Sequence, residues 1–320
     1  MAIIETTGLS KSFKTRRGVV EAVKSVDMKV EQGEIFGFLG PNGAGKTTTM
    51  RMLSTLMQPS GGQATVVGYD LLKEAAKVRE KIGYVSQAGG VDIAISGREN
   101  LVLQARLYRL SAARAKTRTQ ELIIALQLEE FADRAAKTYS GGQKRRLDIA
   151  LGMCHQPPLL FLDEPTTGLD PQSRAHLWEE VRKLRNEGTT VFLTTHYLDE
   201  ADALCDRLCI IDDGTIVAEG TPDVLKRQVA GDVVTVGLDS HNGAILQAQA
   251  LLGKQSFVRE IQVDKDGLRL YVERGEQALP QILRVLDGAG LGIKTISLAR
   301  PSLDDVFLRQ TGRSLREVAA

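Results

Sequence analysis

Short apolar runs alternate with amphipathic stretches over the first two thirds of the chain. Residues 34–39, 82–85, 159–162 and 191–193 are strand-sized runs rich in Ile, Phe, Leu and Val, as in strands buried on both faces. Strands that alternate with helices predict an α/β fold, with a largely parallel sheet covered by helices on both faces.

Helical periodicity fills the spaces between these runs. Apolar residues share one face of a helix predicted over 47–57, and 73–81 is predicted as a second, short helix. From residue 96 to about 139 the pattern is helical almost throughout, which predicts a helical subdomain inserted at about 96–155. Asp213-Gly214 between two apolar runs predicts a hairpin.

The pattern changes near Lys226, where a smaller unit begins. It contains four strand-like runs and two amphipathic helical stretches. The predicted strands are 233–237, 258–263, 268–272 and 294–298, and the predicted helices are 243–252 and 276–286. We therefore expect a main domain over 1–228 and a C-terminal α+β domain over 229–320.

A glycine-rich loop follows directly after the predicted strand 34–39. It reads G-P-N-G-A-G-K-T and fits the phosphate-loop pattern G-x-x-x-x-G-K-[S/T]. Glycines let backbone N–H groups turn toward phosphates, and the N-terminus of the following helix adds positive potential. Lys46 is predicted to contact the outer phosphates, and the Thr47 hydroxyl to hold Mg²⁺. The predicted nucleotide-binding residues here are Gly40, Pro41, Asn42, Gly43, Ala44, Gly45, Lys46, Thr47 and Thr48.

A second candidate half-site lies at the end of the apolar run 159–162. Two carboxylates, Asp163 and Glu164, follow this run. In a phosphate-loop enzyme such an Asp holds Mg²⁺, and an adjacent acid can polarise the attacking water. By itself a strand that ends in Asp-Glu is a common surface feature; together with the loop it predicts nucleotide hydrolysis.

Composition and charge narrow the class of protein. Hydrophobic residues make up 42% and charged residues 25% of the chain, so wholesale disorder is not expected. Lys and Arg total 41 against 40 Asp and Glu, which gives no bulk reason to expect nucleic acid. No run approaches the roughly 18 apolar residues that span a bilayer, and the N-terminus lacks a signal-peptide pattern. We therefore expect a cytoplasmic protein that needs a membrane-crossing partner if it acts at a membrane.

The three cysteines are too few for a disulfide framework. Cys205 and Cys209 are spaced as two metal ligands on a helix could be. Burial as reduced thiols in a cytosolic protein is the favoured interpretation.

A third motif follows the helical insert and precedes the Asp-Glu strand. It is Ser140-Gly141-Gly142-Gln143, which alone would be an ordinary turn sequence. In order and spacing, the phosphate loop, this tetrapeptide and the Asp-Glu strand together resemble the ATP-binding subunit of the ATP-binding-cassette (ABC) family over about residues 1–225. The resemblance implies a P-loop NTPase core that binds ATP and Mg²⁺. It also implies a site shared by two chains, in which the tetrapeptide of one copy faces the nucleotide of the other.

The resemblance assigns roles to further single residues. Gln87 stands at the Gln-loop position, which in the family senses Mg²⁺ and the γ-phosphate and contacts the membrane subunit. His196 matches the switch histidine at the γ-phosphate, and Asp170 matches the loop that meets its symmetry mate. Phe13 stands where the family places an aromatic ring on adenine, although Tyr is more frequent there and a core position is the alternative. The implied catalytic residues are Glu164, His196 and Gln87; the implied metal residues are Thr47, Gln87 and Asp163.

Details beyond the core motifs narrow the class. Residues 96–101, 197–202 and 301–308 look like the daunorubicin-resistance group of ABC exporter ATPases, so the resemblance spans the whole chain. It implies an ATPase subunit, peripheral on the inner face of the membrane, that drives export of a drug-like, lipid or polysaccharide substrate. Its implied partners are a separate membrane permease and a second copy of itself.

Two other functions are alternatives to export. The first is a soluble ABC ATPase of translation or DNA repair, but the chain has neither a second cassette nor a long coiled-coil insertion. The second is a nucleotide-binding regulator without turnover, which the presence of Glu164 disfavours. One departure from the family pattern is Tyr139, where many ABC proteins have Leu; we interpret it as a packing change.

The last predicted helix begins near Ser302. Ser302 is a plausible N-cap with Asp305 three residues on, and Gly312 can end the helix. Leu303, Val306 and Phe307 form an apolar stripe. This stripe either docks on its own domain or contacts a partner.

Overall fold

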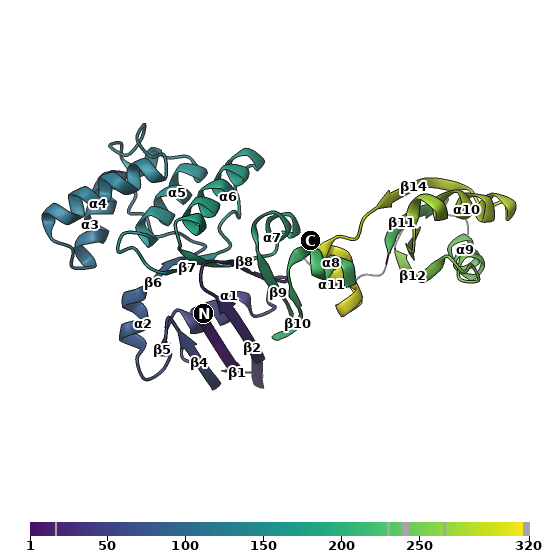
Figure 1. Ribbon diagram of the computed structural model, residues 1–320, viewed down its shortest axis with the longest axis horizontal. Coiled ribbons are helices and arrows are strands. Elements are labelled where there is room, and N and C mark those ends of the chain that lie inside the picture. The colour runs from purple at the N-terminus through teal and green to yellow at the C-terminus, as the bar shows by residue number, and fades with distance from the viewer. Residues whose placement is uncertain (17, 229–230, 239–242, 265–266, 316–320) are drawn as a thin grey trace. The chain divides into compact units, whose positions relative to one another are not determined.

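The computed structural model describes residues 1–320 except 17, 229–230, 239–242, 265–266 and 316–320. The chain divides into two compact units, which are described separately (Figure 1). The first is Met1–Pro222 together with Leu315, and the second is Asp223–Ser314. These compact units separate after Pro222, six residues before the expected domain boundary between residues 228 and 229. That boundary remains a prediction.

One ten-stranded sheet forms the centre of the first unit, in the order β5-β4-β1-β2-β10-β9-β3-β8-β7-β6. Its strands are β1 Ala2–Thr15, β2 Gly18–Glu31, β3 Ile35–Leu39, β4 Gly61–Val66, β5 Tyr69–Asp70, β6 Ile82–Val85, β7 Leu159–Asp163, β8 Thr190–Thr195, β9 Arg207–Asp212 and β10 Thr215–Gly220. The strands β9, β3, β8, β7 and β6 run parallel to one another. The predicted hairpin at Asp213-Gly214 joins β9 to β10, which is confirmed by their antiparallel pairing.

The prediction of a largely parallel sheet is wrong for the N-terminal strands. β1 pairs antiparallel with both β2 and β4, and β4 pairs antiparallel with β5. Short turns join β1 to β2 and β4 to β5, and strands joined in this way pair antiparallel, because a parallel pair needs a crossover of a dozen or more residues. No such turn joins β1 to β4, since β2, β3 and α1 lie between them in the chain. Along β2, Val26, Met28 and Val30 are buried while the residues between them are exposed, as expected for a strand with one face in the core.

Helices cover both faces of the parallel strands, as predicted (Figure 1). The helices of this unit are α1 Lys46–Leu53, α2 Ala75–Lys81, α3 Gly97–Leu107, α4 Ala112–Ala125, α5 Gly141–Gly152, α6 Pro171–Asn186 and α7 Leu198–Leu204, with a 3₁₀ turn at Ala136–Thr138. Figure 1 shows α1 on one side of β7 and β8, and α5, α6 and α7 on the other. The helical insert thus consists of α3, α4 and the 3₁₀ turn, followed by α5.

Two predicted helical stretches are shorter in the structure. α1 ends at Leu53 rather than near residue 57, because the chain turns at Thr55, whose φ is 63°. The stretch 96–139 is interrupted after α3 and again after α4 by Arg109 and Gln127, whose φ values are 62° and 52°. Periodicity marks which residues face the core and misses such turns, which need a positive φ and carry no glycine here.

The core of the first unit lies around α1. Met50, Met52 and Leu53 of α1 are fully buried, in one cluster with apolar residues of the parallel and the antiparallel strands. Phe192 of β8 lies at the centre of this cluster, with its ring centroid 5.7 Å from Phe36 and 5.6 Å from Phe161. The helix that begins at Lys46 is therefore held on several sides, which fixes the loop that precedes it.

The second unit has its own sheet and core. Its strands are β11 Asp232–Leu238, β12 Val258–Asp264, β13 Gly267–Val272 and β14 Ile293–Ala299, and its helices are α9 Ala244–Leu252, α10 Gly275–Gly288 and α11 Leu303–Thr311. Helix α8 Pro222–Gln228 begins at the last residue of the first unit and continues into the second. The order β12-β13-β11-β14, all antiparallel, with α9 and α10 as crossovers, is the βαββαβ arrangement of ferredoxin-like folds. All six elements predicted for this unit are confirmed.

Helix α11 has the caps that its sequence predicts. Ser302 and Asp305 form a reciprocal capping box, and Gly312 ends the helix at a φ of 75°. The apolar stripe of α11 is at most 2% exposed, and Asp305 Oδ1 accepts a hydrogen bond from Arg269 Nη1 of β13 at 3.2 Å. Burial within the chain favours docking over a contact with a partner. Among the described residues, no helix combines the length and the apolar character that a membrane span requires.

Candidate functional site

Four parallel strands bring the predicted site residues to one edge of the sheet. Leu39 of β3 pairs with Thr195 of β8, and Asp163 of β7 pairs with Thr194. The end of β6 lies beside β7 in the same direction. Residues that follow these strands must therefore emerge together, at the edge where ligands bind in open α/β sheets.

The phosphate loop connects β3 to α1 in a conformation that needs glycine. Gly43 and Gly45 have φ values of 84° and 104°, and a Cβ added to Gly45 would lie 2.5 Å from the carbonyl oxygen of Ala22. The Lys46 side chain folds back along this loop and donates from Nζ to the carbonyl oxygens of Gly40 at 2.8 Å and Pro41 at 3.0 Å. Glycine thus permits the close approach of backbone that a phosphate cradle requires.

Lys46 also meets the catalytic candidate Glu164. Its Nζ lies 3.5 Å from Glu164 Oε1, and the two side chains are 4% and 9% exposed. Burial lowers the pKa of Lys46, and the charge of Glu164 opposes that shift. A buried cation held by one carboxylate and two carbonyls is a suitable partner for an incoming phosphate anion.

A hydroxyl and a carboxylate face each other between α1 and β7. Thr47 Oγ1 donates to Asp163 Oδ1 at 3.0 Å, and Thr194 Oγ1 donates to the same oxygen at 2.7 Å. Mg²⁺ prefers oxygen ligands and is usually bound through one or two carboxylates together with substrate phosphates. The donor set of Thr47 and Asp163 therefore fits Mg²⁺. The described residues hold no group of three or more His, Cys, Asp or Glu around a common point.

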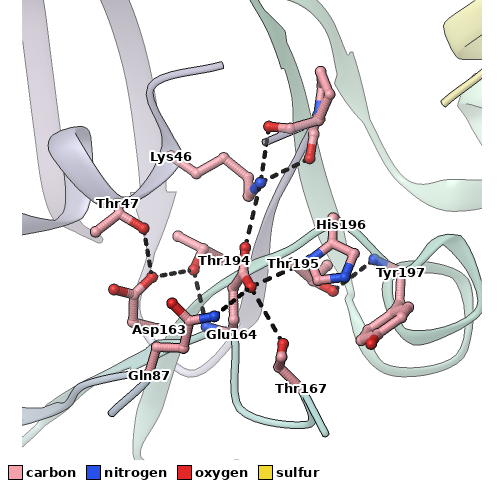
Figure 2. A network of polar contacts seen from close by, with 12 residues as sticks. Lys46, Thr47, Gln87, Asp163, Glu164, Thr167, Thr194, Thr195, His196 and Tyr197 are labelled. Atoms are coloured by element: carbon pink, nitrogen blue, oxygen red, sulfur yellow. Dashed lines mark hydrogen bonds and ion pairs between the residues drawn. The ribbon is translucent and has the colours of Figure 1, made fainter. Parts of the chain in front are cut away.

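Four side chains converge on the carboxylate of Glu164, as Figure 2 shows. Besides Lys46, its Oε2 accepts hydrogen bonds from Gln87 Nε2 at 3.1 Å and from Thr167 Oγ1 at 3.2 Å. His196 Nδ1 lies 3.2 Å from Oε2 as well. Burial alone would raise the pKa of Glu164, but His196, Lys46 and Thr167 together outweigh it and hold the pKa below its usual value. Glu164 is therefore ionised at neutral pH and able to accept a proton.

The backbone of Glu164 is unusual. Its φ is 44°, which is sparsely populated for a residue with a side chain. Its N–H donates to the carbonyl oxygen and to the hydroxyl of Thr194, both at 3.1 Å. Strained residues of this kind persist only where the surroundings hold them, and they cluster at functional sites.

The tetrapeptide at residues 140–143 begins helix α5. The hydroxyl of Ser140 accepts from the backbone N–H of Gln143, and the Gln143 side chain accepts from the N–H of Ser140, which forms a capping box. A Cβ added to Gly142 would lie 3.0 Å from Ser173 Oγ, and one added to Gly141 would lie 3.5 Å from Leu169. Within the described part of the chain, no hydrogen bond or ion pair joins this tetrapeptide to the phosphate loop.

Two predicted contact residues have local roles in the single chain. Asp170 is the N-cap of α6 and accepts hydrogen bonds from the backbone N–H of Ser173 at 2.9 Å and from its hydroxyl at 2.6 Å. Phe13 lies on β1, partly exposed and outside the buried core, with Lys11 Nζ 5.4 Å from its ring centroid. Their roles toward a partner chain and toward adenine remain predictions.

Sequence reasoning missed Thr167, Thr194 and Arg145. Thr194 anchors both Asp163 and Glu164, and Arg145 of α5 is buried beneath them. The only signal for Thr194 was its place at the carboxyl end of a predicted parallel strand. Arg145 had no signal, because an arginine in an amphipathic helix usually points to solvent.

The sequence interpretations of Tyr139 and of the cysteines agree with the structure. Tyr139 is 6% exposed, donates from its hydroxyl to the carbonyl oxygen of Phe131 at 2.6 Å and packs edge-on against the Phe131 ring. It is therefore a packing residue. All three cysteines are buried and unpaired, and burial raises the pKa of each thiol, so they are inert structural residues.

Comparison with protein families identifies both parts of the chain. Residues 23–167 match the family described as ABC transporter. Residues 220–311 match the family described as ATP-binding protein DrrA1-3-like, C-terminal domain. The two matches correspond to the α/β core with its phosphate loop and to the βαββαβ unit.

Curated relatives match over nearly the whole chain. The daunorubicin/doxorubicin resistance ATP-binding protein DrrA of Streptomyces peucetius is 45% identical, with 99% of this chain and 96% of that protein covered. The daunorubicin resistance ATP-binding protein DrrA3 of Streptomyces coeruleorubidus is 44% identical, with 95% and 96% covered. The Nod factor export ATP-binding protein I of Cupriavidus pinatubonensis is 38% identical, with 99% and 93% covered.

Solved structures share the fold of the first unit. A dimeric, post-hydrolysis structure of the ATP-binding cassette MJ0796 bound to ADP and Pi matches with a TM-score of 0.63 and 26% identity, covering 68% of this chain and 98% of that one. The ATP-binding subunit of an ABC transporter matches with a TM-score of 0.62 and 30% identity, covering 71% and 92%. The predicted P-loop core of the ABC type is thereby confirmed.

Proposed function

The chain belongs to the ATP-binding proteins of ABC transporters, and on this basis we propose that it hydrolyses ATP to power export through a separate membrane permease. As a member of this family it binds ATP. The observation that carries the proposal of turnover is the convergence of Lys46, Gln87, Thr167 and His196 on the ionised carboxylate of Glu164. A binding protein without turnover has no need of such a base next to the phosphate loop.

Each residue of the site has its own role in the proposed hydrolysis of ATP. Backbone N–H groups of the phosphate loop (residues 40–48 except Pro41, which has no N–H) and Lys46 Nζ bind the phosphates, and Glu164 accepts the proton of the attacking water. Gln87 and His196 orient that carboxylate and contact the γ-phosphate. Thr47 and Asp163, with Gln87, would hold Mg²⁺, which supplies charge neutralisation between the outer phosphates. Phe13 offers its ring for stacking on adenine.

The complete site is proposed to need two copies of the chain. The tetrapeptide at 140–143 has no hydrogen bond or ion pair to the phosphate loop within the described part of its own chain, yet Ser140 carries a hydroxyl and Gly142 a free N–H at a helix N-terminus. Such a terminus suits an anion, and the similar MJ0796 cassette is dimeric in its solved structure. ATP would then bind between two copies, with Asp170 at the contact between them, and dimer closure and reopening would drive transport.

Replacement of Ser140 by Arg tests the shared site. We expect the Ser140→Arg protein to bind ATP as a monomer and to fail to dimerise on it, because the bulky cation fills the space for the partner's γ-phosphate. Size exclusion with and without MgATP measures this. The change also removes a helix cap, which costs about 1 kcal/mol, so Ser96→Arg is the control, since Ser96 caps α3 in the same way. ATP-dependent dimers of Ser140→Arg at the parental level would contradict the model.

The proposed substrate and partners follow the relatives. Proteins named for daunorubicin resistance and for Nod factor export resemble this chain over almost its full length, which supports export of a drug-like, lipid or polysaccharide compound. The chain would act on the inner face of the cell membrane, bound to a permease. Co-purification with a polytopic membrane protein from the native membrane tests this, and its absence would leave the soluble alternative in translation or repair, which the relatives do not favour.

The nucleotide site is proposed to be independent of the βαββαβ unit. We expect a chain without residues 230–320 to keep its affinity for ATP, since each motif that contacts nucleotide precedes residue 200. Titration with a fluorescent ATP analogue measures the affinity, a melting curve checks folding, and the truncated Lys46→Ala protein provides the weak-binding control. A folded truncation that no longer binds ATP would overturn the domain assignment.

A further inference from the structure

Arg145 of α5 is buried beneath the proposed site and donates hydrogen bonds to three main-chain carbonyl oxygens. It is 7% exposed. Its Nε donates to the carbonyl oxygen of Pro165 at 2.7 Å, Nη1 to that of Ser86 at 2.7 Å and Nη2 to that of Asp163 at 3.0 Å. All three nitrogen atoms of the guanidinium are therefore occupied, in the fixed geometry of a planar fork.

The three carbonyl oxygens belong to residues adjacent in sequence to Glu164 and Gln87, whose side chains meet at the site. Asp163 and Pro165 flank Glu164 in sequence, and Ser86 precedes Gln87. Gln87 in turn donates to the Glu164 carboxylate at 3.1 Å. Arg145 thus holds the backbone on both sides of Glu164, whose φ of 44° needs such support.

Asp148 adds a second anchor from the same helix. It lies one turn after Arg145, is 8% exposed, and accepts a hydrogen bond from the backbone N–H of Gly90 at 2.7 Å. A Cβ added to Gly89 would lie 2.7 Å from Asp148 Oδ2, so the chain passes close to this carboxylate. Arg145 and Asp148 therefore fasten the Gln87 loop at both ends, Ser86 and Gly90, to one face of α5.

We propose that Arg145, assisted by Asp148, is a positioning residue for hydrolysis that sets the geometry of Glu164 and Gln87 from helix α5. This inference rests on the proposed function, because it needs Glu164 as the base. The N-cap of α5 is Ser140, which is proposed to face the nucleotide of the second copy. The guanidinium therefore links the segment that meets one nucleotide to the carboxylate that acts on the other, and a shift of α5 changes the catalytic geometry of its own chain.

Arg145→Lys tests the proposal, because a positioning residue should affect the turnover of ATP and leave the affinity for MgATP nearly unchanged. Lys keeps the positive charge, but its single ammonium group cannot reproduce the planar fork that reaches all three carbonyl oxygens. Within the described part of the chain no hydrogen bond or ion pair joins Arg145 to the phosphate loop, so the KM for MgATP should stay within about threefold. Turnover should fall by about 10²-fold, as for a displaced catalytic group. Arg118→Lys is the matched control, since Arg118 is 12% exposed and bonds the carbonyl oxygen of Met153 away from the site.

The outcomes separate this inference from the proposed function. If the parent protein does not hydrolyse ATP, the proposed function fails. If the parent is active and Arg145→Lys turns over at the parental rate, or loses affinity and turnover together while folded, the positioning role is overturned. If Arg145→Lys does not fold, Asp148→Ala replaces it, with turnover several-fold lower at unchanged affinity expected; parental turnover would overturn the proposal.

A double mutant shows whether Arg145 acts through Glu164. Residues that work as one unit have non-additive effects. The protein with both Arg145→Lys and Glu164→Gln should hydrolyse MgATP no more slowly than Glu164→Gln alone. A further loss in the double mutant would assign Arg145 a separate role and contradict the proposal.

Discussion

Replacing Glu164 with Gln is expected to slow hydrolysis strongly and to trap an ATP-bound dimer. Gln keeps the shape of the side chain and can still hydrogen-bond to water, but it cannot accept a proton. The loss of a general base lowers turnover by about 10²–10⁴-fold. Lys46, Thr47 and Asp163 remain, so MgATP should still bind. Phosphate release measures turnover, and size exclusion with MgATP measures the dimer.

The trap has an electrostatic reason as well as a kinetic one. Reopening follows loss of the γ-phosphate, which the substitution slows. The substitution also removes two carboxylates from an interface that holds two triphosphates, which relieves like-charge repulsion. We therefore expect the dimer of the variant to persist where that of the parent is transient.

Glu34→Gln is the control that shows whether the loss of turnover in Glu164→Gln is specific to that position or follows from the loss of any carboxylate. Glu34 lies at the amino end of β3, away from the site, and pairs with Arg207 at 2.9 Å. Glu34→Gln should keep parental turnover. If Glu164→Gln hydrolysed ATP at the parental rate, Glu164 would not be the base; if it lost dimerisation too, its role would lie in structure or in metal binding.

Replacing Lys46 with Ala is expected to abolish turnover and to weaken nucleotide binding. The change removes a charge-assisted hydrogen bond to the phosphates, worth about 1.5–3 kcal/mol or roughly 10–10²-fold in affinity. It also leaves the buried Glu164 carboxylate without its cation, so the site becomes more negative where the phosphates must bind. Titration with a fluorescent ATP analogue and a phosphate-release assay measure the two effects.

A surface lysine provides the control for this change. Lys77 pairs with Glu74 at 2.9 Å on the exposed side of α2, and Lys77→Ala should leave affinity and turnover at parental values. A melting curve for both variants excludes unfolding as the cause. Near-parental hydrolysis by Lys46→Ala would refute the site assignment.

The sequence by itself determined the features that depend on contiguous residues. The phosphate loop is a single stretch between a strand and a helix, and its glycines, its lysine and its threonine must stand in that order to surround a phosphate. The same applies to the strand before Asp163, to the N-cap at Ser302, and to the six elements of the βαββαβ unit. Each of these follows from periodicity or from contacts between residues a few positions apart.

Only the tertiary structure decided which distant residues meet. Gln87 and Glu164 are separated by 77 positions, and Thr47 and Asp163 by 116; composition and periodicity contain nothing that joins them. The resemblance placed these residues in one site, but the geometry added Thr167 and Thr194, and it turned Arg145 inward beneath Glu164. It also paired the N-terminal strands antiparallel around α1. These contacts arise from strand order and burial, which are properties of the packed chain as a whole, whereas a pattern read along the sequence reports only the local preferences of its residues.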